Sequence, residues 1–139
     1  MSTTQEEVKA IVRRNTEQVQ VGGDFALFDE LFADDFVDHT PQPGFTPDKN
    51  GARQLYRGLR AAFPDFKADI RWQTIEGDLV TTYKIYSGTH RGPFLGLEGT
   101  GRTVEFETVD AMRVRNGRIT DHWGVANLLS LVRQINAEG

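Results

Sequence analysis

The chain predicts an α+β fold, with N-terminal helices packed on a curved, mostly antiparallel sheet, because helical and strand patterns occupy separate parts of the sequence. Apolar residues recur at helical spacing up to residue 63, and the alternating patterns typical of strands follow. The 139 residues, 38% hydrophobic and 26% charged, suit a single domain, residues 1–139, that can bury a core.

Three helices are expected in the N-terminal part. Thr4 opens a capping box for a first helix that continues to the Gly22-Gly23 pair. Asp24 is the expected cap of a short second helix, and Asp48 is the expected cap of a third that ends at Pro64. A short extended piece, residues 36–39, precedes the loop that leads to the third helix.

The strands follow in the second half. Residues 66–75 and 79–91 form the first two, residues 103–127 form a hairpin, and residues 128–135 form a last helix. The glycine-rich loop at residues 92–101 separates two strands and is expected to form a rim or lid.

The hairpin turns at Asn116-Gly117, the sequence most typical of a two-residue type I′ turn. This turn predicts a register in which Arg115 pairs with Arg118. The further pairs are Val114 with Ile119, Met112 with Asp121, Asp110 with Trp123, Thr108 with Val125 and Phe106 with Asn127.

In this register two acidic residues, Asp110 and Asp121, lie side by side on the apolar face of the hairpin, whereas His122 falls on the polar face. Diagonal neighbours in a ladder are roughly 7 Å apart, close enough for one charge to raise the pKa of the other. Neither carboxylate has a Lys or Arg on its own face of the hairpin. Both aspartates are therefore candidates for acid/base catalysis.

Composition excludes several classes of function. A net charge of −4 without a basic stripe argues against nucleic-acid binding. No apolar segment suits a signal peptide or a membrane helix, so no membrane partner and a cytoplasmic location are expected. The chain has no cysteine, and the three histidines at 39, 90 and 122 lack the close spacing of metal ligands, so no metal site is predicted.

Three separated motifs resemble those of a known family. They are GRITDHW at residues 117–123 with its continuation at 128–134, FVDHTP at residues 36–41, and SGTHRGPFLG at residues 87–96 with TGR at 100–102. Together they resemble the SnoaL-like polyketide cyclases of the NTF2-like superfamily. The resemblance implies a cone-shaped α+β barrel formed by one SnoaL-like domain.

The same resemblance implies an enzyme without a cofactor that closes a ring in an aromatic polyketide ester by intramolecular aldol condensation. It implies an acid/base role for the carboxylate of Asp121. The family pattern also has a histidine on the preceding strand, and residues 103–115 contain none. Either Glu105, Glu107 or Asp110 replaces it, or the chemistry differs from that of the family. The alternatives are a hydroxylase of anthracycline precursors and a non-catalytic binding or dimerisation module of the same fold.

The candidate site contains three catalytic residues, Asp121, His39 and Asp110, although a structural role stays open for each. The expected ligand is a hydrophobic, planar small molecule. The residues expected to bind it are Trp123, Met112, Phe106, His90 and Asn127. The second face of the hairpin is expected to pack on a helix or on the partner in a homodimer; it contains Val109, Ala111, Gly124 and Ala126.

Overall fold

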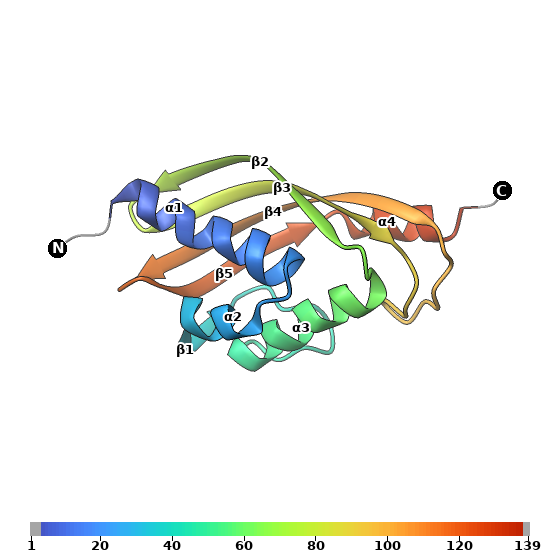
Figure 1. Cartoon of the computed structure of the whole chain (residues 1–139), viewed down its shortest axis with the longest axis horizontal. Helices are drawn as coiled ribbons and strands as arrows, with labels where there is room; N and C mark the ends of the chain where they lie inside the picture. The colour runs from blue at the N-terminus through green and yellow to red at the C-terminus, as the bar shows by residue number, and fades with distance from the viewer. Residues whose placement is uncertain (1–3, 138–139) are drawn as a thin grey trace.

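A five-stranded sheet in the order β1-β5-β4-β3-β2 forms the frame of the fold in the computed structural model, which describes residues 4–137 (Figure 1). The strands are β1 (Phe32–Asp38), β2 (Lys67–Glu76), β3 (Leu79–Thr89), β4 (Thr103–Arg115) and β5 (Arg118–Ala126). Strands β2 to β5 pair antiparallel, and only β1 runs parallel to its neighbour β5. The predicted α+β class with a mostly antiparallel sheet is confirmed.

Four α-helices pack against this sheet within residues 4–137: α1 (Gln5–Arg14), α2 (Phe25–Leu31), α3 (Lys49–Ala62) and α4 (Leu128–Ile135). The three predicted caps are present, because the side chains of Thr4, Asp24 and Asp48 each accept a hydrogen bond from a backbone N–H three residues on. These local contacts fix where α1, α2 and α3 begin.

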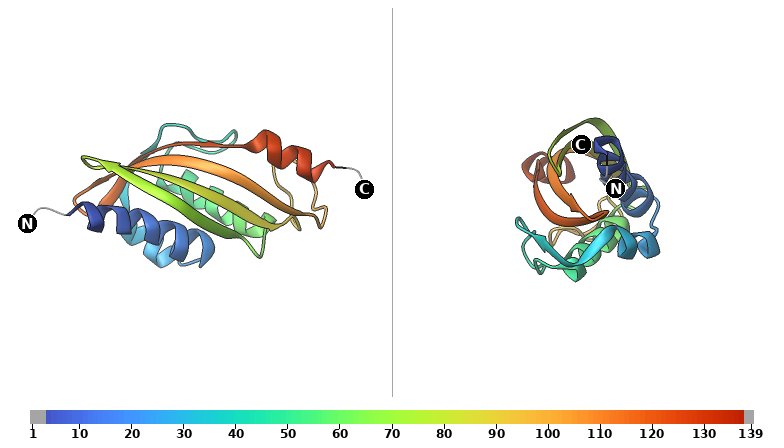
Figure 2. Two further views of the ribbon diagram at one scale, coloured as in Figure 1. Left: turned by 90° about the horizontal axis from the view of Figure 1, so that it is seen from above. Right: turned by 90° about the vertical axis from the view of Figure 1, so that its left-hand side faces the viewer.

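The sheet curves, and α1, α2 and α3 close its concave side, as the end-on view in Figure 2 shows. Helix α1 packs against β2, β3 and β4, α3 packs against β1, and α4 packs against β4 at the far end of the molecule (Figure 1). No helix within residues 4–137 is long and apolar enough to cross a membrane.

Two elements differ from the expectation. The first helix changes at Asn15 into a π-helical segment, η1 (Asn15–Val21), whose wider turns keep Asn15, Val19 and Gln20 all buried. Strand β1 begins at Phe32 rather than at residue 36, because pairing with β5 extends it. Neither feature has a local sequence signal, since both depend on the packing of distant segments.

In the part of the chain that the structure describes, the core consists of two apolar clusters. One contains Phe28, Phe32 and Ile119, and the other contains Phe63, Phe66 and Leu131. Side chains from both clusters line a cavity between the concave face of the sheet and α3. This cavity is the candidate site.

Candidate active site

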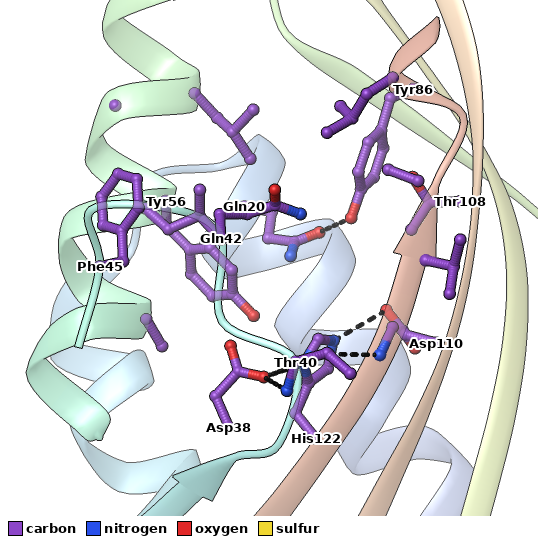
Figure 3. A pocket seen from close by; sticks show the side chains of 18 of the residues that line it. Gln20, Asp38, Thr40, Gln42, Phe45, Tyr56, Tyr86, Thr108, Asp110 and His122 are labelled. Atoms are coloured by element: carbon purple, nitrogen blue, oxygen red, sulfur yellow. Dashed lines mark hydrogen bonds and ion pairs between the residues drawn. The ribbon is translucent and has the colours of Figure 1, made fainter. Parts of the chain in front are cut away.

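The cavity has a volume of about 260 Å³ and mostly apolar walls (Figure 3). Strands β3, β4 and β5 provide one wall, α3 provides another, and the loops after β1 and β3 contribute the rim. The apolar lining includes Phe36, Phe45, Leu55, Leu59, Phe94, Phe106 and Leu128. Its polar lining includes Gln20, Asp38, Tyr56, Tyr86, Thr108, Asp110 and His122.

A β-bulge at Thr120 determines which side chains of β5 reach this cavity. The turn is of the predicted kind, since Asn116 and Gly117 both have positive φ, and the predicted pairs Arg115–Arg118 and Val114–Ile119 are confirmed. Beyond them the register shifts by one residue.

Beyond the bulge the predicted register is wrong, because the shift moves every later residue of β5 to the opposite face of the sheet. Met112 pairs with His122 rather than with Asp121, and Asp110 pairs with Gly124 rather than with Trp123. The expectation that Asp110 and Asp121 share the inner face is therefore wrong. His122, predicted to face outward, lies in the cavity instead.

His122 is held by Asp38 at the end of β1. The His122 Nδ1 atom lies 2.9 Å from Asp38 Oδ1, and the backbone N–H of Thr40 donates to the same oxygen at 3.0 Å. Burial raises the pKa of Asp38, but the hydrogen bond and charge of His122, together with Thr40, outweigh it, so the pKa lies below its ordinary value. The ionised carboxylate accepts the Nδ1 proton and leaves Nε2 facing the cavity.

Asp110 lies on the other side of this imidazole. Its Oδ2 atom is 4.0 Å from His122 Nε2 and 2.8 Å from Lys84 Nζ (Figure 3 shows Asp110 and His122). Lys84 and Asp110 are 1% and 3% exposed. Burial lowers the pKa of Lys84, but the charge and hydrogen bond of Asp110, together with Tyr86, outweigh it and hold the pKa above its ordinary value. The predicted lack of a cationic partner is wrong for both carboxylates. Strand β3 supplies Lys84 to Asp110, and Arg113 of the hairpin itself lies 3.9 Å from Asp121.

Gly124 leaves the space that the His122 ring occupies. A Cβ atom at position 124 would lie 2.8 Å from both the Cε1 and Nε2 atoms of His122. Any side chain at this position would therefore displace the imidazole. Gly124 and Ala126 line the cavity, contrary to their predicted place on the outer face of the hairpin.

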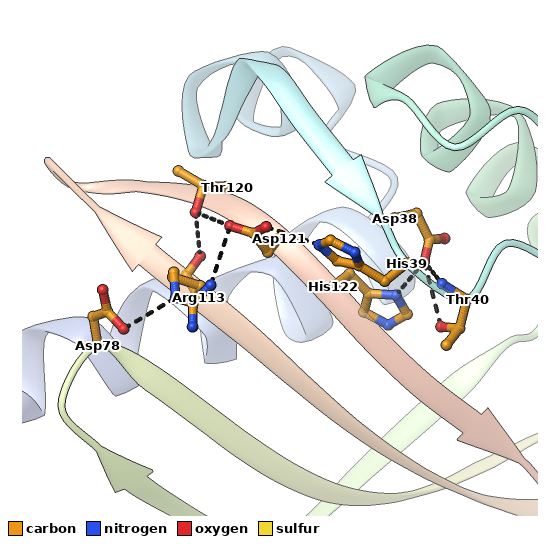
Figure 4. Close-up of polar contacts among 8 residues, drawn as sticks. All are labelled: Asp38, His39, Thr40, Asp78, Arg113, Thr120, Asp121 and His122. Atoms are coloured by element: carbon orange, nitrogen blue, oxygen red, sulfur yellow. Dashed lines mark hydrogen bonds and ion pairs between the residues drawn. The ribbon is translucent and has the colours of Figure 1, made fainter.

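Asp121 forms a second His–carboxylate pair on the outer face of the sheet. Its Oδ2 atom lies 2.9 Å from His39 Nε2, and Thr120 and Arg113 contact its other oxygen (Figure 4). Burial raises the pKa of Asp121, but His39, Thr120 and Arg113 outweigh it and hold the pKa below its ordinary value. Trp123 also lies outside the cavity lining, stacked on His39 with ring centroids 4.3 Å apart.

The two Asp–His pairs are crossed, because in each pair the aspartate and the histidine come from different strands. Strand β1 ends in Asp38 followed by His39, and its parallel neighbour β5 contains Asp121 followed by His122. Consecutive residues point to opposite faces, so Asp38 meets His122 inside and His39 meets Asp121 outside. The repeated Asp-His dipeptide is the sequence signal that could have revealed this arrangement.

The other predicted site residues lie in different parts of the structure. Phe106 lines the cavity as predicted. Met112 is buried in the core, and Asn127 caps α4. His90 is fully buried against the ring of Phe63. Met112, Asn127 and His90 are not part of the cavity lining. Sequence reasoning missed Lys84, because its partner Asp110 lies on another strand.

Solved structures share this architecture. TsrD from Streptomyces laurentii superposes with a TM-score of 0.88 at 23% identity, covering 99% of this chain and 100% of that chain. AclR, a candidate hydroxylase from Streptomyces galilaeus, superposes with a TM-score of 0.84 at 23% identity, covering 97% and 84%. These similarities define the fold as the NTF2-like α+β fold, as predicted.

Sequence similarity identifies the family in addition to the fold. IdmH from Streptomyces antibioticus, a candidate polyketide cyclase, is 30% identical over 94% of this chain and 99% of that chain, with a TM-score of 0.81. The sequence profile of the SnoaL-like polyketide cyclases matches residues 10–135. The chain therefore belongs to the SnoaL-like polyketide cyclase family. No protein of curated function matches it in sequence.

Proposed function

We propose that this protein is an acid/base enzyme of the polyketide cyclase type, which closes a ring in an aromatic polyketide ester by intramolecular aldol condensation. The observation that carries the proposal is the position of His122 between the carboxylates of Asp38 and Asp110 in a mostly apolar cavity. Acid/base groups of enzymes are typically found in such surroundings.

The reaction needs a base that first removes a proton from carbon. With Nδ1–H donated to Asp38, the free Nε2 of His122 takes this proton from the carbon beside a carbonyl group. The resulting carbanion attacks a second carbonyl carbon of the same molecule, and the proton returns to the oxygen that becomes a hydroxyl group. Substrate and product have the same mass, because no atom is gained or lost.

The two carboxylates have separate tasks in this mechanism. Asp38 orients the imidazole and stabilises its cation, as the acidic member of a His–Asp pair does. Asp110 adds negative charge 4.0 Å from Nε2, while Lys84 compensates its burial. The family pattern has a histidine on the strand that corresponds to β4 and an acid on β5. We propose the reverse for this protein, with the acid Asp110 on β4 and the histidine His122 on β5.

The walls of the cavity favour a planar, hydrophobic substrate. Aromatic rings of Phe36, Phe45 and Phe106 face a space of about 260 Å³, close to the smallest volumes typical of ligand pockets. Pro93, Phe94 and Leu95 of the glycine-rich loop line the rim, so this loop is proposed to cover bound substrate.

The test is an incubation of the purified protein with a panel of tricyclic polyketide methyl esters, followed by absorbance and mass spectrometry. We expect a product of unchanged mass that heat-denatured protein does not form. A product heavier by one oxygen atom would instead support the hydroxylase alternative. Ligand binding without any turnover of the panel would contradict the proposed reaction and favour a binding module.

We further propose that the protein is a homodimer formed through the outer face of the sheet. The strand register places four apolar side chains in one row across β2, β3, β4 and β5: Trp72, Tyr83, Val109 and Val125. Trp72, Val109 and Val125 are 47%, 39% and 74% exposed. Glu107 and Arg113 flank the row on β4, so a second copy related by a two-fold axis can pair opposite charges.

A charge in this row tests the dimer. The wild-type protein is expected to sediment with twice the mass of the chain, and Val125→Lys is expected to shift it to a monomer, because burying an unpaired ammonium opposes association. Leu129→Lys on α4 is the matched control, since Leu129 is 63% exposed but lies outside the row. A monomeric wild type, or a dimer in both variants, would contradict this interface.

A further inference from the structure

Two polar atoms in the cavity wall have no hydrogen-bond partner among residues 4–137. They are Asp110 Oδ1 and Thr108 Oγ1, both fully buried atoms of side chains that line the cavity (Figure 3). Thr108 is 8% exposed and Asp110 is 3% exposed. Buried polar atoms are almost always paired, so an unpaired couple in a ligand cavity points to a partner on the ligand.

The two atoms belong to one patch of the wall. Thr108 and Asp110 are two residues apart on β4 and therefore point to the same face of the sheet. The other oxygen of Asp110, Oδ2, is occupied by Lys84 at 2.8 Å. The ammonium group compensates the charge of the carboxylate, and Oδ1 remains as an acceptor.

We propose that Asp110 Oδ1 and Thr108 Oγ1 form a subsite for a phenolic hydroxyl group of the ligand. The hydroxyl proton is donated to Asp110 Oδ1, and the hydroxyl oxygen accepts the proton of Thr108 Oγ1. A ketone or ether oxygen accepts but has no proton to donate, so it leaves the carboxylate oxygen unpaired. The inference rests on the proposed function in one respect, since it takes the cavity as the substrate site.

The subsite predicts that the cavity binds a hydroxylated aromatic ring more tightly than a less polar ring of the same size. An apolar cavity alone binds the less polar member of a ligand pair more tightly, because transfer from water favours it. The proposed subsite reverses this order for aromatic rings that carry a hydroxyl group. The substrate class is therefore narrowed to planar rings with a phenolic or enolic hydroxyl.

Calorimetric titration of the wild-type protein at neutral pH with naphthalene, 2-naphthol and 2-methoxynaphthalene tests the preference. 2-Naphthol is expected to bind about tenfold more tightly than either of the others, because only it can donate to the charged acceptor. Equal binding of 2-naphthol and 2-methoxynaphthalene would overturn the hydroxyl subsite and leave the proposed reaction standing. No binding of any of the three would overturn the cavity as the ligand site, and both proposals with it.

Variants at position 108 assign the subsite to these residues. Thr108→Val keeps the shape of the side chain and removes its hydroxyl, so it is expected to reduce the preference for 2-naphthol by about fivefold. Thr108→Ser restores the hydroxyl and is expected to restore the preference. Circular dichroism confirms folding of both variants. An unchanged preference in folded Thr108→Val would overturn the role of Thr108.

Discussion

Replacing His122 by asparagine is expected to lower turnover by about 10²- to 10⁴-fold, the usual contribution of one acid/base group. Asparagine retains a polar side chain next to Asp38 but cannot take up a proton at neutral pH. The loss is expected in kcat rather than in KM, because the cavity walls that bind the substrate do not change. Single-turnover and steady-state rates on a substrate from the ester panel measure this effect.

The outer pair provides the matched controls for this experiment. Asp121→Asn and His39→Asn remove one member each of an Asp–His pair that lies outside the cavity lining. Each is expected to change turnover by less than about tenfold, far below the effect of an acid/base group. If Asp121→Asn abolishes turnover while His122→Asn retains it, the catalytic group is the carboxylate that the family resemblance implied, and the mechanism through His122 is wrong.

Replacing Lys84 by methionine is expected to lower the free energy of unfolding by about 3–5 kcal/mol, the cost of leaving one partner of a buried ion pair uncompensated. Asp110 is 3% exposed, and no other ammonium or guanidinium group contacts it among residues 4–137. Methionine fills most of the volume of the lysine stem, so the charge rather than a cavity causes the loss. Urea denaturation followed by circular dichroism measures it.

A double variant separates this charge effect from general damage to the core. The double variant Lys84→Met with Asp110→Leu is expected to recover most of the stability, because both charges are replaced by apolar groups. A loss below about 1 kcal/mol in Lys84→Met would contradict the buried pair.

Much of the fold follows from local sequence signals. Thr4, Asp24 and Asp48 cap their helices because each side chain reaches a backbone amide three residues away. Asn116-Gly117 fixes its turn because both residues accept positive φ. These signals act over a few residues and need no knowledge of the rest of the chain.

The site was harder to predict because its wall is not a packed core. The hydrophobic pattern of β5 favours Trp123 and Val125 as inward residues, and that choice gave the wrong register. In the structure small residues, Gly124 and Ala126, line the cavity and leave room for a ligand and for the His122 ring. A rule that places large apolar residues inside fails where the interior must stay open.

The sequence by itself determined the fold class, the element order, the helix caps, the turn and the family, because each depends on local patterns or on motifs retained along the chain. Only the tertiary structure decided which histidine and which carboxylates meet. Strand β1 lies beside β5 across about eighty residues of chain, and their crossed Asp–His pairs exist only when the two strands are aligned. The bulge at Thr120 accompanies that alignment and turns His122, rather than Asp121, into the cavity.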